Sequence, residues 1–239
     1  RGAVTTMSSW TPPRWRPRRW RWCLAIVAAS LVLGSGVAIA ASLAIASDDL
    51  TTSTILATVP ISTCTVTPSA DSYVDQATLQ QGSNFGGATA LQVESSQTLA
   101  LIPTNKRSFV KFDLSSCSIP AVAAVQSATL SVFLSSAPNQ NRTWNIGRIT
   151  SAWTENNIAW PGPAATNSTS VTTGTTSNVT LSANVTSDVA SFVSGSQANH
   201  GWRFSDSAES SSTQRNGQFR SREFGTVSER PTLVINYYP

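Results

Sequence analysis

The sequence predicts an all-β fold, an antiparallel β-sandwich of the jelly-roll type, preceded by a signal peptide or a membrane-anchor helix. Three observations lead to this prediction. Short runs alternate between apolar and polar residues, clusters of Gly, Ser, Asn and Pro separate these runs, and helical patterns are nearly absent after residue 47. Alternation with a period of two is typical of antiparallel strands buried on one face. The chain of 239 residues is long enough for one such domain and a targeting segment.

The N-terminal part, residues 1–46, has the pattern of an export leader. Six of the sixteen basic residues precede an uncharged run at residues 23–46. This run ends in two small-x-small sites, at residues 38–40 and 44–46, that suit a signal peptidase, and it is also long enough to span a bilayer uncleaved. Cleavage is the favoured alternative. Both alternatives export the remainder, so we expect an extracellular or cell-surface protein that meets a membrane only through an uncleaved anchor.

The charge distribution argues against nucleic acid as a partner. The formal net charge is +4, but the excess of basic residues lies in the leader. From residue 47 onward, ten Lys and Arg stand against twelve Asp and Glu. Binding to nucleic acid requires a basic surface, which a domain of this near-neutral composition does not predict.

Two cysteines remain in the exported part. Cys64 and Cys117 form an even pair in an oxidising compartment, so we expect a disulfide between them. It would close a loop of about fifty residues. The alternative is a pair of free thiols or a metal site, but with one histidine in the whole chain a zinc site is not expected.

The exported part divides into a spacer or extended strand at residues 47–63 and a β-domain at residues 64–239. One short helix is expected at residues 186–195, and the Thr- and Ser-rich residues 166–180 are expected to form a loop. Alternating runs predict strands at residues 90–95, 107–114, 127–134, 143–149 and 232–238.

Two stretches combine basic and aromatic residues. In the strand 107–114, Arg107, Phe109 and Lys111 share one face, opposite an apolar face. The segment GQFRSREFG, residues 217–225, interpreted as a strand, places Arg220 and Arg222 together on one side.

Together these four basic residues would form a cationic strip suited to an acidic ligand, because guanidinium groups match carboxylates. The alternative is that they pair with Asp113, Glu223 or Glu229 and only rim the sheet, where exposed ion pairs contribute little. The residue pattern leaves both interpretations open.

Two tryptophans, Trp153 and Trp160, flank the segment TENNIA and are candidates for stacking on a sugar ring. The alternative is that they belong to the core, because tryptophan contributes large buried areas there.

No catalytic motif stands out, so we expect a protein that is not an enzyme. The single histidine, His200, has no serine in a nucleophile elbow near it in the sequence, and the acidic residues are scattered. An esterase or lyase is kept as a minor alternative. No cofactor is expected, except that Asp71, Asp75 or Asp206 could contribute to a structural calcium site.

Several segments, taken in order, resemble the DNRLRE-type domain, which overlaps carbohydrate-binding module family 96. They are ADSYVDQATLQQGSNFGGATALQVES (70–95), KRSFVKFDLSSCSIP (106–120), VQSATLSVFL (125–134), GRITSAWTENNIAW (147–160), GWRFSDSAESSS (201–212) and FRSREFG with RPTLVINY (219–237). The resemblance covers about residues 65–239. One departure is IAWPGPAA at residues 158–165, where the family would have a Trp-Asn-Gln-Pro-like run.

The resemblance implies an exported, non-catalytic β-sandwich module that binds a polysaccharide. Some family members bind alginate, a polyuronate, and many are attached to polysaccharide-degrading enzymes, so a separate enzyme of that kind is an expected partner. The family's FxSRE-like segment maps onto Phe219, Ser221, Arg222 and Glu223, and its basic strand onto Arg107, Phe109, Val110 and Lys111.

The second hypothesis is a structural cell-surface or filament subunit without a small ligand. In that case residues 47–63 could add a strand to a neighbour's sheet, and the chain would self-assemble.

Overall fold

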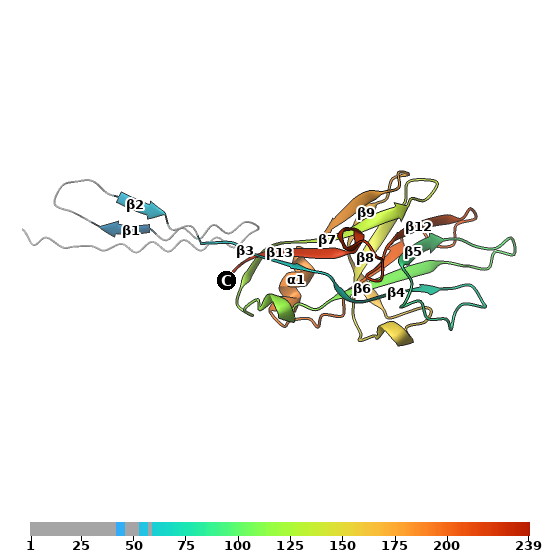
Figure 1. Ribbon diagram of the computed structural model, residues 1–239, viewed down its shortest axis with the longest axis horizontal. Coiled ribbons are helices and arrows are strands. Elements are labelled where there is room, and N and C mark those ends of the chain that lie inside the picture. The colour runs from blue at the N-terminus through green and yellow to red at the C-terminus, as the bar shows by residue number, and fades with distance from the viewer. Residues whose placement is uncertain (1–41, 46–52, 57–58) are drawn as a thin grey trace, which may run out of the picture. The chain divides into compact units, whose positions relative to one another are not determined.

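The computed structural model describes residues 42–45, 53–56 and 59–239 (Figure 1). Strands β1 (Ser42–Ile45) and β2 (Ser53–Leu56) pair with each other in a two-stranded antiparallel sheet. Within the described residues, no helix has the length and apolar character needed to cross a membrane. The rest of the expected leader and spacer lies outside the described residues.

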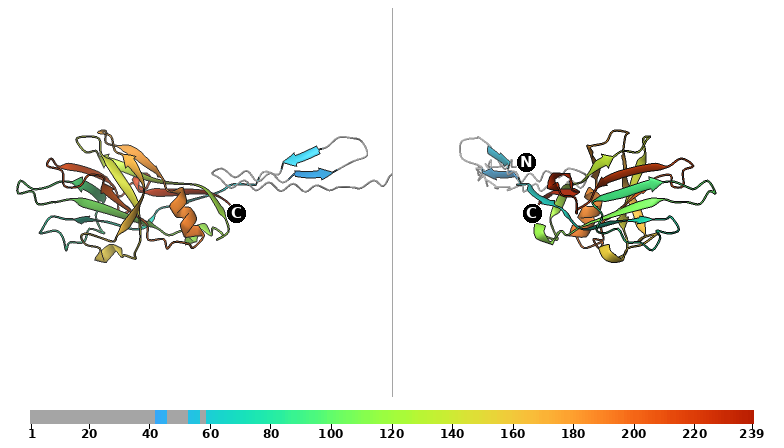
Figure 2. Two further views of the ribbon diagram at one scale, coloured as in Figure 1. Left: turned by 180° about the vertical axis from the view of Figure 1, so that it is seen from behind. Right: turned by 45° about the vertical axis from the view of Figure 1, so that its right-hand side comes forward.

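Residues 59–239 form one eleven-stranded antiparallel sheet that curls around its own core (Figure 2). Along the sheet the order is β3-β13-β7-β12-β5-β6-β11-β8-β9, with β10 paired to β7 and β4 paired to β6. The strands are β3 (Ser62–Val66), β4 (Pro68–Asp75), β5 (Ala90–Ser95), β6 (Lys106–Phe112), β7 (Ala124–Ser136), β8 (Thr143–Ile149), β9 (Ala165–Thr172), β10 (Val179–Asn184), β11 (Trp202–Asp206), β12 (Arg215–Arg220) and β13 (Thr232–Tyr238). The prediction of an antiparallel all-β protein is confirmed, while the jelly-roll assignment stays a prediction.

The predicted strands occur where the alternation indicated them. Strands β5, β8 and β13 coincide with the predicted ranges, β6 ends two residues earlier and β7 is longer at both ends. The predicted loop at residues 166–180 is wrong in part, because β9 and the start of β10 occupy it. Strand β9 lies at one edge of the sheet and exposes most of its side chains, so it lacks the apolar alternation that reveals a half-buried strand.

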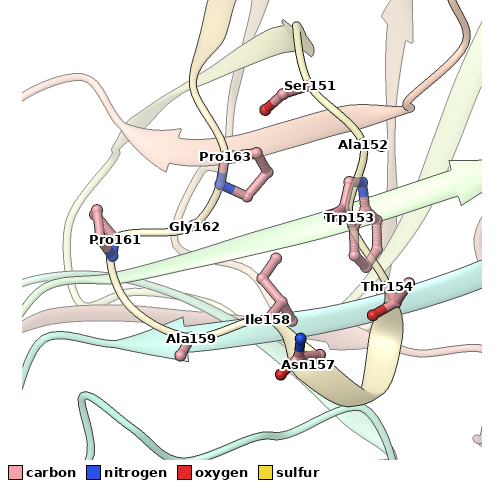
Figure 3. A pocket seen from close by; sticks show the side chains of 10 residues that line it. All are labelled: Ser151, Ala152, Trp153, Thr154, Asn157, Ile158, Ala159, Pro161, Gly162 and Pro163. Carbon is pink, nitrogen blue, oxygen red and sulfur yellow. The ribbon is translucent and has the colours of Figure 1, made fainter.

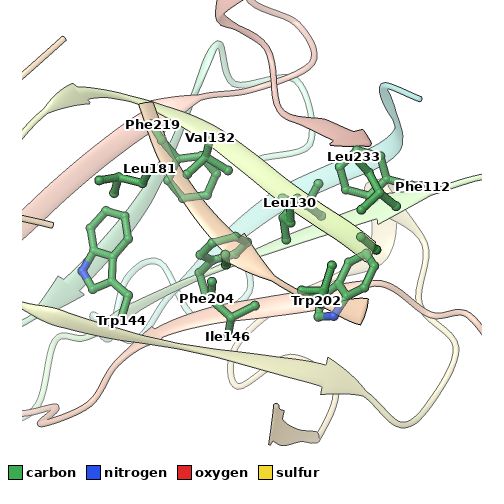
Figure 4. Packing of buried hydrophobic residues seen from close by; sticks show 14 of the residues in the cluster. Phe112, Leu130, Val132, Trp144, Ile146, Leu181, Trp202, Phe204, Phe219 and Leu233 are labelled. Carbon is green, nitrogen blue, oxygen red and sulfur yellow. The ribbon is translucent and has the colours of Figure 1, made fainter. Parts of the chain in front are cut away.

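The main core fills the inside of the curled sheet and is rich in aromatic rings. Trp144, Phe204 and Phe219 pack in series, with ring centroids 6.0 Å apart for Trp144 and Phe219 and 5.1 Å apart for Phe204 and Phe219 (Figure 4). All three are almost completely buried. Aromatic rings of this size dominate the energetics of a core, so these contacts hold β8, β11 and β12 together across the inside of the sheet.

The predicted helix at residues 186–195 is present as α1 (Thr186–Val193) and lies at the end of this unit where the chain terminates (Figure 2). Phe192 of α1 lies 5.5 Å from the ring of Trp202, and the indole Nε1 of Trp202 donates a hydrogen bond to Asp188 Oδ2 at 2.8 Å. Trp202 therefore fixes the helix against the sheet through both its ring and its polar edge.

The predicted disulfide is present. Cys64 in β3 is bonded to Cys117 at the end of a 3₁₀ turn (Ser115–Cys117), with Cα atoms 5.7 Å apart. Strand β3 lies at the other edge of the sheet, and the turn belongs to the connection between β6 and β7. The bond therefore links the edge strand to this connection.

A second, smaller core lies on the outer face of the sheet, which we define as the face away from the main core. It contains Val74 of β4, Phe109 of β6, Ile149 of β8 and Ile158 of the connection between β8 and β9. We call this connection, residues 150–164, the β8–β9 loop. The predicted division of strand β6 is confirmed, because Phe109 belongs to this outer core and Val110 to the main core.

Candidate functional site

The β8–β9 loop forms a pocket on the outer face. The pocket has a volume of about 470 Å³, within the range typical of ligand sites. Figure 3 shows Trp153 on one side of it and Pro161 and Pro163 on the other, with Ile158 between them. The lining is completed by Ser151, Ala152, Thr154, Asn157, Ala159 and Gly162. An apolar wall with a few hydroxyl and amide groups is the composition expected of a site that binds a polar ligand with apolar faces.

Both tryptophans predicted from the sequence belong to this loop and are partly buried. Trp153 donates its indole N–H to the carbonyl of His200 at 2.8 Å, and its ring lies 6.0 Å from Phe109. Trp160 packs under the guanidinium of Arg107, 4.4 Å from the ring centroid. Both tryptophans therefore take part in the outer core, as the core alternative predicted, and Trp153 also lines the pocket. Stacking of either indole on a sugar ring stays a prediction.

Gly162 allows the loop to lie directly on Phe109. Its φ is +72°, and a Cβ atom built there would lie 2.3 Å from Cζ of Phe109. The variant Gly162→Ala should therefore lower the free energy of unfolding by about 2–4 kcal/mol, because left-handed backbone strain adds to overpacking. Urea unfolding measures this.

The matched control is Gly174→Ala, where φ is +66° but the nearest atom to a Cβ is 4.0 Å away. This variant carries the backbone strain alone, about 1–2 kcal/mol. Equal losses in the two variants would contradict the close packing of the loop on Phe109.

Three basic side chains surround Phe109 on the outer face. Arg107 and Lys111 lie two residues before and after it on β6, and Arg203 is directly opposite it on β11. The predicted pairing of Arg107 with Lys111 is thus extended by a residue that the sequence analysis missed. The sequence did contain an indication of this residue, because neighbouring residues of a strand face opposite sides. Trp202 and Phe204 are buried in the main core, so Arg203 between them faces outward.

The three basic residues differ in how they are paired. Arg107 makes a two-pronged ion pair with Glu209, with both N–O distances at 2.7 Å, and also donates to the carbonyl of Pro161. Within residues 59–239, Lys111 and Arg203 take part in no ion pair. Arg107 is thus held in place, whereas the charges of the other two are uncompensated by direct contact.

Arg203 is the least satisfied of these groups. Burial lowers the pKa of its guanidinium from the ordinary value, the charge of Arg107 lowers it further, and Glu209 partly offsets both. Its Nε is buried and has no acceptor within the described residues. A buried donor without an acceptor costs about 1–3 kcal/mol, so a ligand oxygen at this position would remove an existing penalty.

The segment GQFRSREFG is different from the expected strand. Strand β12 ends at Arg220, and the next residues turn, with the N–H of Phe224 donating to the carbonyl of Ser221. The prediction of a strand through residue 225 is therefore wrong. The last contact with the β5 segment is the hydrogen bond from the N–H of Ser221 to the carbonyl of Thr89. Beyond it the chain turns, because the N–H of Glu223 donates to Ser221 Oγ and the N–H of Arg222 donates to Asp71 Oδ2.

Each arginine of this segment is paired with an acid. Arg220 contacts Glu229 at 3.1 Å and lies over the ring of Phe224. Arg222 contacts Glu155 at 2.8 Å and Glu223 at 2.7 Å. For these two arginines the geometry therefore matches the ion-pair alternative. The basic residue that lies near Arg107 and Lys111 is Arg203. A ligand-binding role for Arg220 and Arg222 stays a prediction.

Arg222 is the centre of a cluster of acids that anchors the β8–β9 loop. Its backbone N–H donates to Asp71 Oδ2 at 2.7 Å, and the N–H of Asp71 donates to Glu155 at 2.9 Å. Burial raises the pKa of Asp71 to about 8; the carboxylates of Glu223 and Glu155 also raise it, and the Arg222 N–H lowers it. Glu155 belongs to the loop, so these contacts fasten the pocket to β4.

Of the three residues predicted as calcium ligands, two have other partners. Asp75 contacts Lys106 at 3.7 Å, and Asp206 accepts from the guanidinium of Arg142. Asp71 alone lies among further carboxylates, those of Glu155 and Glu223.

Comparison with known families identifies the family of this chain. The model of carbohydrate-binding module family 96 matches residues 62–237, from the first residue of β3 into β13. The chain belongs to carbohydrate-binding module family 96. The resemblance of the ordered segments to family 96 is confirmed. A comparison with curated proteins found no match.

For a family 96 module, the expected ligand is a polysaccharide. The outer face of β6 and β11, together with the β8–β9 loop, carries a pocket, two partly buried indoles and two basic groups, Lys111 and Arg203, that have no ion-pair partner within residues 59–239. We therefore take this surface, named the outer-face site and defined by Arg107, Lys111, Arg203, Trp153 and Trp160, as the candidate carbohydrate site.

Proposed function

We propose that this chain is an exported, non-catalytic module that binds an acidic polysaccharide, such as a polyuronate, at the outer-face site. Family membership supports the polysaccharide, and the basic residues support its acidic character. The single observation that carries the proposal is Arg203, whose buried Nε lacks an acceptor within the described residues and which lies directly opposite Phe109. Phe109 in turn packs against Gly162 and Trp153 of the pocket lining. The disulfide supports export, because such bonds persist in oxidising compartments.

The chemistry of the site assigns a different task to each side chain. Trp153 offers an aromatic face to the apolar face of a sugar ring. Arg203 and Lys111 supply hydrogen-bond donors and positive charge for the carboxylate of a uronate, since guanidinium and carboxylate match in geometry. Arg107, already paired with Glu209 and packed on Trp160, positions the loop and adds to the positive field.

The first experiment is affinity electrophoresis of the chain through gels containing alginate, pectin, cellulose or xylan. We expect retardation by alginate or pectin that weakens with added salt, because exposed charge interactions are screened. Arg203→Gln should weaken that retardation about 10- to 100-fold, since a charged hydrogen bond contributes about 1.5–3 kcal/mol. It should change stability little, because Arg203 takes part in no ion pair within residues 59–239 that the substitution would break.

The matched control is Arg215→Gln, which removes the same charge from β12, where the Arg215 guanidinium donates to Asn139 Oδ1 at 2.9 Å. This variant should keep the retardation. Equal loss in both variants would show general charge attraction and contradict a site at Arg203. Absence of retardation in every gel would favour the structural-subunit hypothesis, and a salt-independent response to cellulose would indicate a neutral glucan.

A further inference from the structure

Three carboxylates from distant parts of the chain meet on the sheet. Asp71 comes from β4, Glu155 from the β8–β9 loop and Glu223 from the turn after β12, and each offers an oxygen within 4.8 Å of the others. One cation, Arg222, contacts two of these acids directly. A carboxylate that binds a metal ion must be ionised, and with all three ionised one guanidinium leaves two negative charges for the ion to balance.

The hydrogen bonds of the cluster leave two buried oxygens without any donor. Asp71 Oδ2 accepts from the N–H of Arg222, and Glu155 accepts from Asp71 and from the Arg222 guanidinium. Asp71 Oδ1 and Glu223 Oε2 are buried and have no hydrogen-bond partner within the described residues. Asp71 as a whole has a relative exposure of 0%. Buried polar atoms are almost always satisfied, so these two oxygens indicate a further positively charged occupant.

We propose that Asp71, Glu155 and Glu223 bind a divalent hard cation, with Ca²⁺ as the best match. The three residues provide only oxygen donors, which hard cations prefer to nitrogen or sulfur. A charge of +2 balances the two negative charges that Arg222 leaves. Calcium is favoured over magnesium because it accepts irregular carboxylate geometry, whereas magnesium demands a near-ideal octahedron.

The cation would fasten three segments that are far apart in the sequence, β4, the β8–β9 loop and the turn after β12. The Arg222 side chain is 37% exposed, so the cluster reaches solvent on that side and an ion can enter and leave. The proposal concerns stability and the position of the loop, and it does not depend on which polysaccharide is bound.

The test is thermal unfolding of the full chain after chelation, with EDTA, CaCl₂ or MgCl₂ added. Calcium at one hundred times its dissociation constant should raise the midpoint by about 5–10 °C, because it binds only the folded state. Calorimetric titration with CaCl₂ should give one ion per chain. Magnesium should give a smaller shift.

Two variants separate a cation from a proton shared between Asp71 and Glu223. Asp71→Asn removes a charge but keeps the shape and supplies an N–H to the neighbouring oxygen, so it should fold and lose the calcium shift. Asp75→Asn, which removes an acid outside the cluster, should keep the shift. The proposal is overturned if calcium does not change the midpoint of the wild-type chain, or if it shifts Asp71→Asn as much as the wild type. If calcium has no effect and Asp71→Asn is more stable than the wild type, the occupant is a proton shared between Asp71 and Glu223.

Discussion

Trp202→Ala should lower the free energy of unfolding by about 3–5 kcal/mol, the loss typical of removing a buried aromatic side chain. Trp202 is fully buried, packs against Phe112 and Phe192 and donates to Asp188. The substitution leaves a cavity and also removes the hydrogen bond to a buried carboxylate. Urea unfolding monitored by far-UV circular dichroism measures the change through the midpoint concentration.

Trp153→Ala is the matched comparison, because Trp153 is partly buried and lines the pocket. It should lower stability by only about 1–2 kcal/mol, since less apolar area is lost from the interior. It should, however, weaken retardation by an acidic polysaccharide, whereas any Trp202→Ala protein that still folds should keep it. A Trp153→Ala protein with unchanged retardation would contradict a stacking role for this indole.

Replacing Cys64 and Cys117 together by serine should lower the free energy of unfolding by about 4 kcal/mol. The bond closes a loop with a sequence separation of 53 residues, and in the chain-entropy model a cross-link of that length restricts the unfolded chain by about this amount. For a domain of this size, the midpoint of thermal unfolding should fall by roughly 8–16 °C.

Reduction of the wild-type protein is the corresponding control. Thermal unfolding in dithiothreitol should bring the wild-type midpoint close to that of the double serine variant, and the reductant should leave the variant unchanged. A wild-type midpoint insensitive to complete reduction would contradict a stabilising role for the bond.

The structure gives the SRE part of GQFRSREFG a structural role that a search for ligand contacts would overlook. Ser221 is buried, Arg222 bridges Glu155 and Glu223, and Glu155 carries the loop that forms the pocket. The segment therefore holds the β8–β9 loop through the ion pair between Arg222 and Glu155. The ligand-binding groups that we propose, Arg203 and Lys111, lie on β11 and β6.

Much of the β-fold could be predicted from local patterns. Strands β5, β8 and β13 follow from alternation because each buries one face against the main core, and this burial selects apolar residues at every second position. The helix α1 and the disulfide were likewise predictable from residue types and spacing. Strand β9 was not, because an exposed edge strand places almost no constraint on its side chains.

The sequence by itself determined five of the eleven strands of the main sheet, the disulfide pair, the family and the two tryptophans of the loop. These depend on local periodicity, residue type or ordered motifs. Only the tertiary structure decided the partners of the charged residues. Arg203 lies 96 positions from Arg107 yet faces the same side of the sheet, and Arg222 meets Glu155 across a sequence separation of 67 residues. Charge pairing acts over a few ångströms, so it depends on which strands the curled sheet places side by side, and residue spacing along the chain does not contain that information.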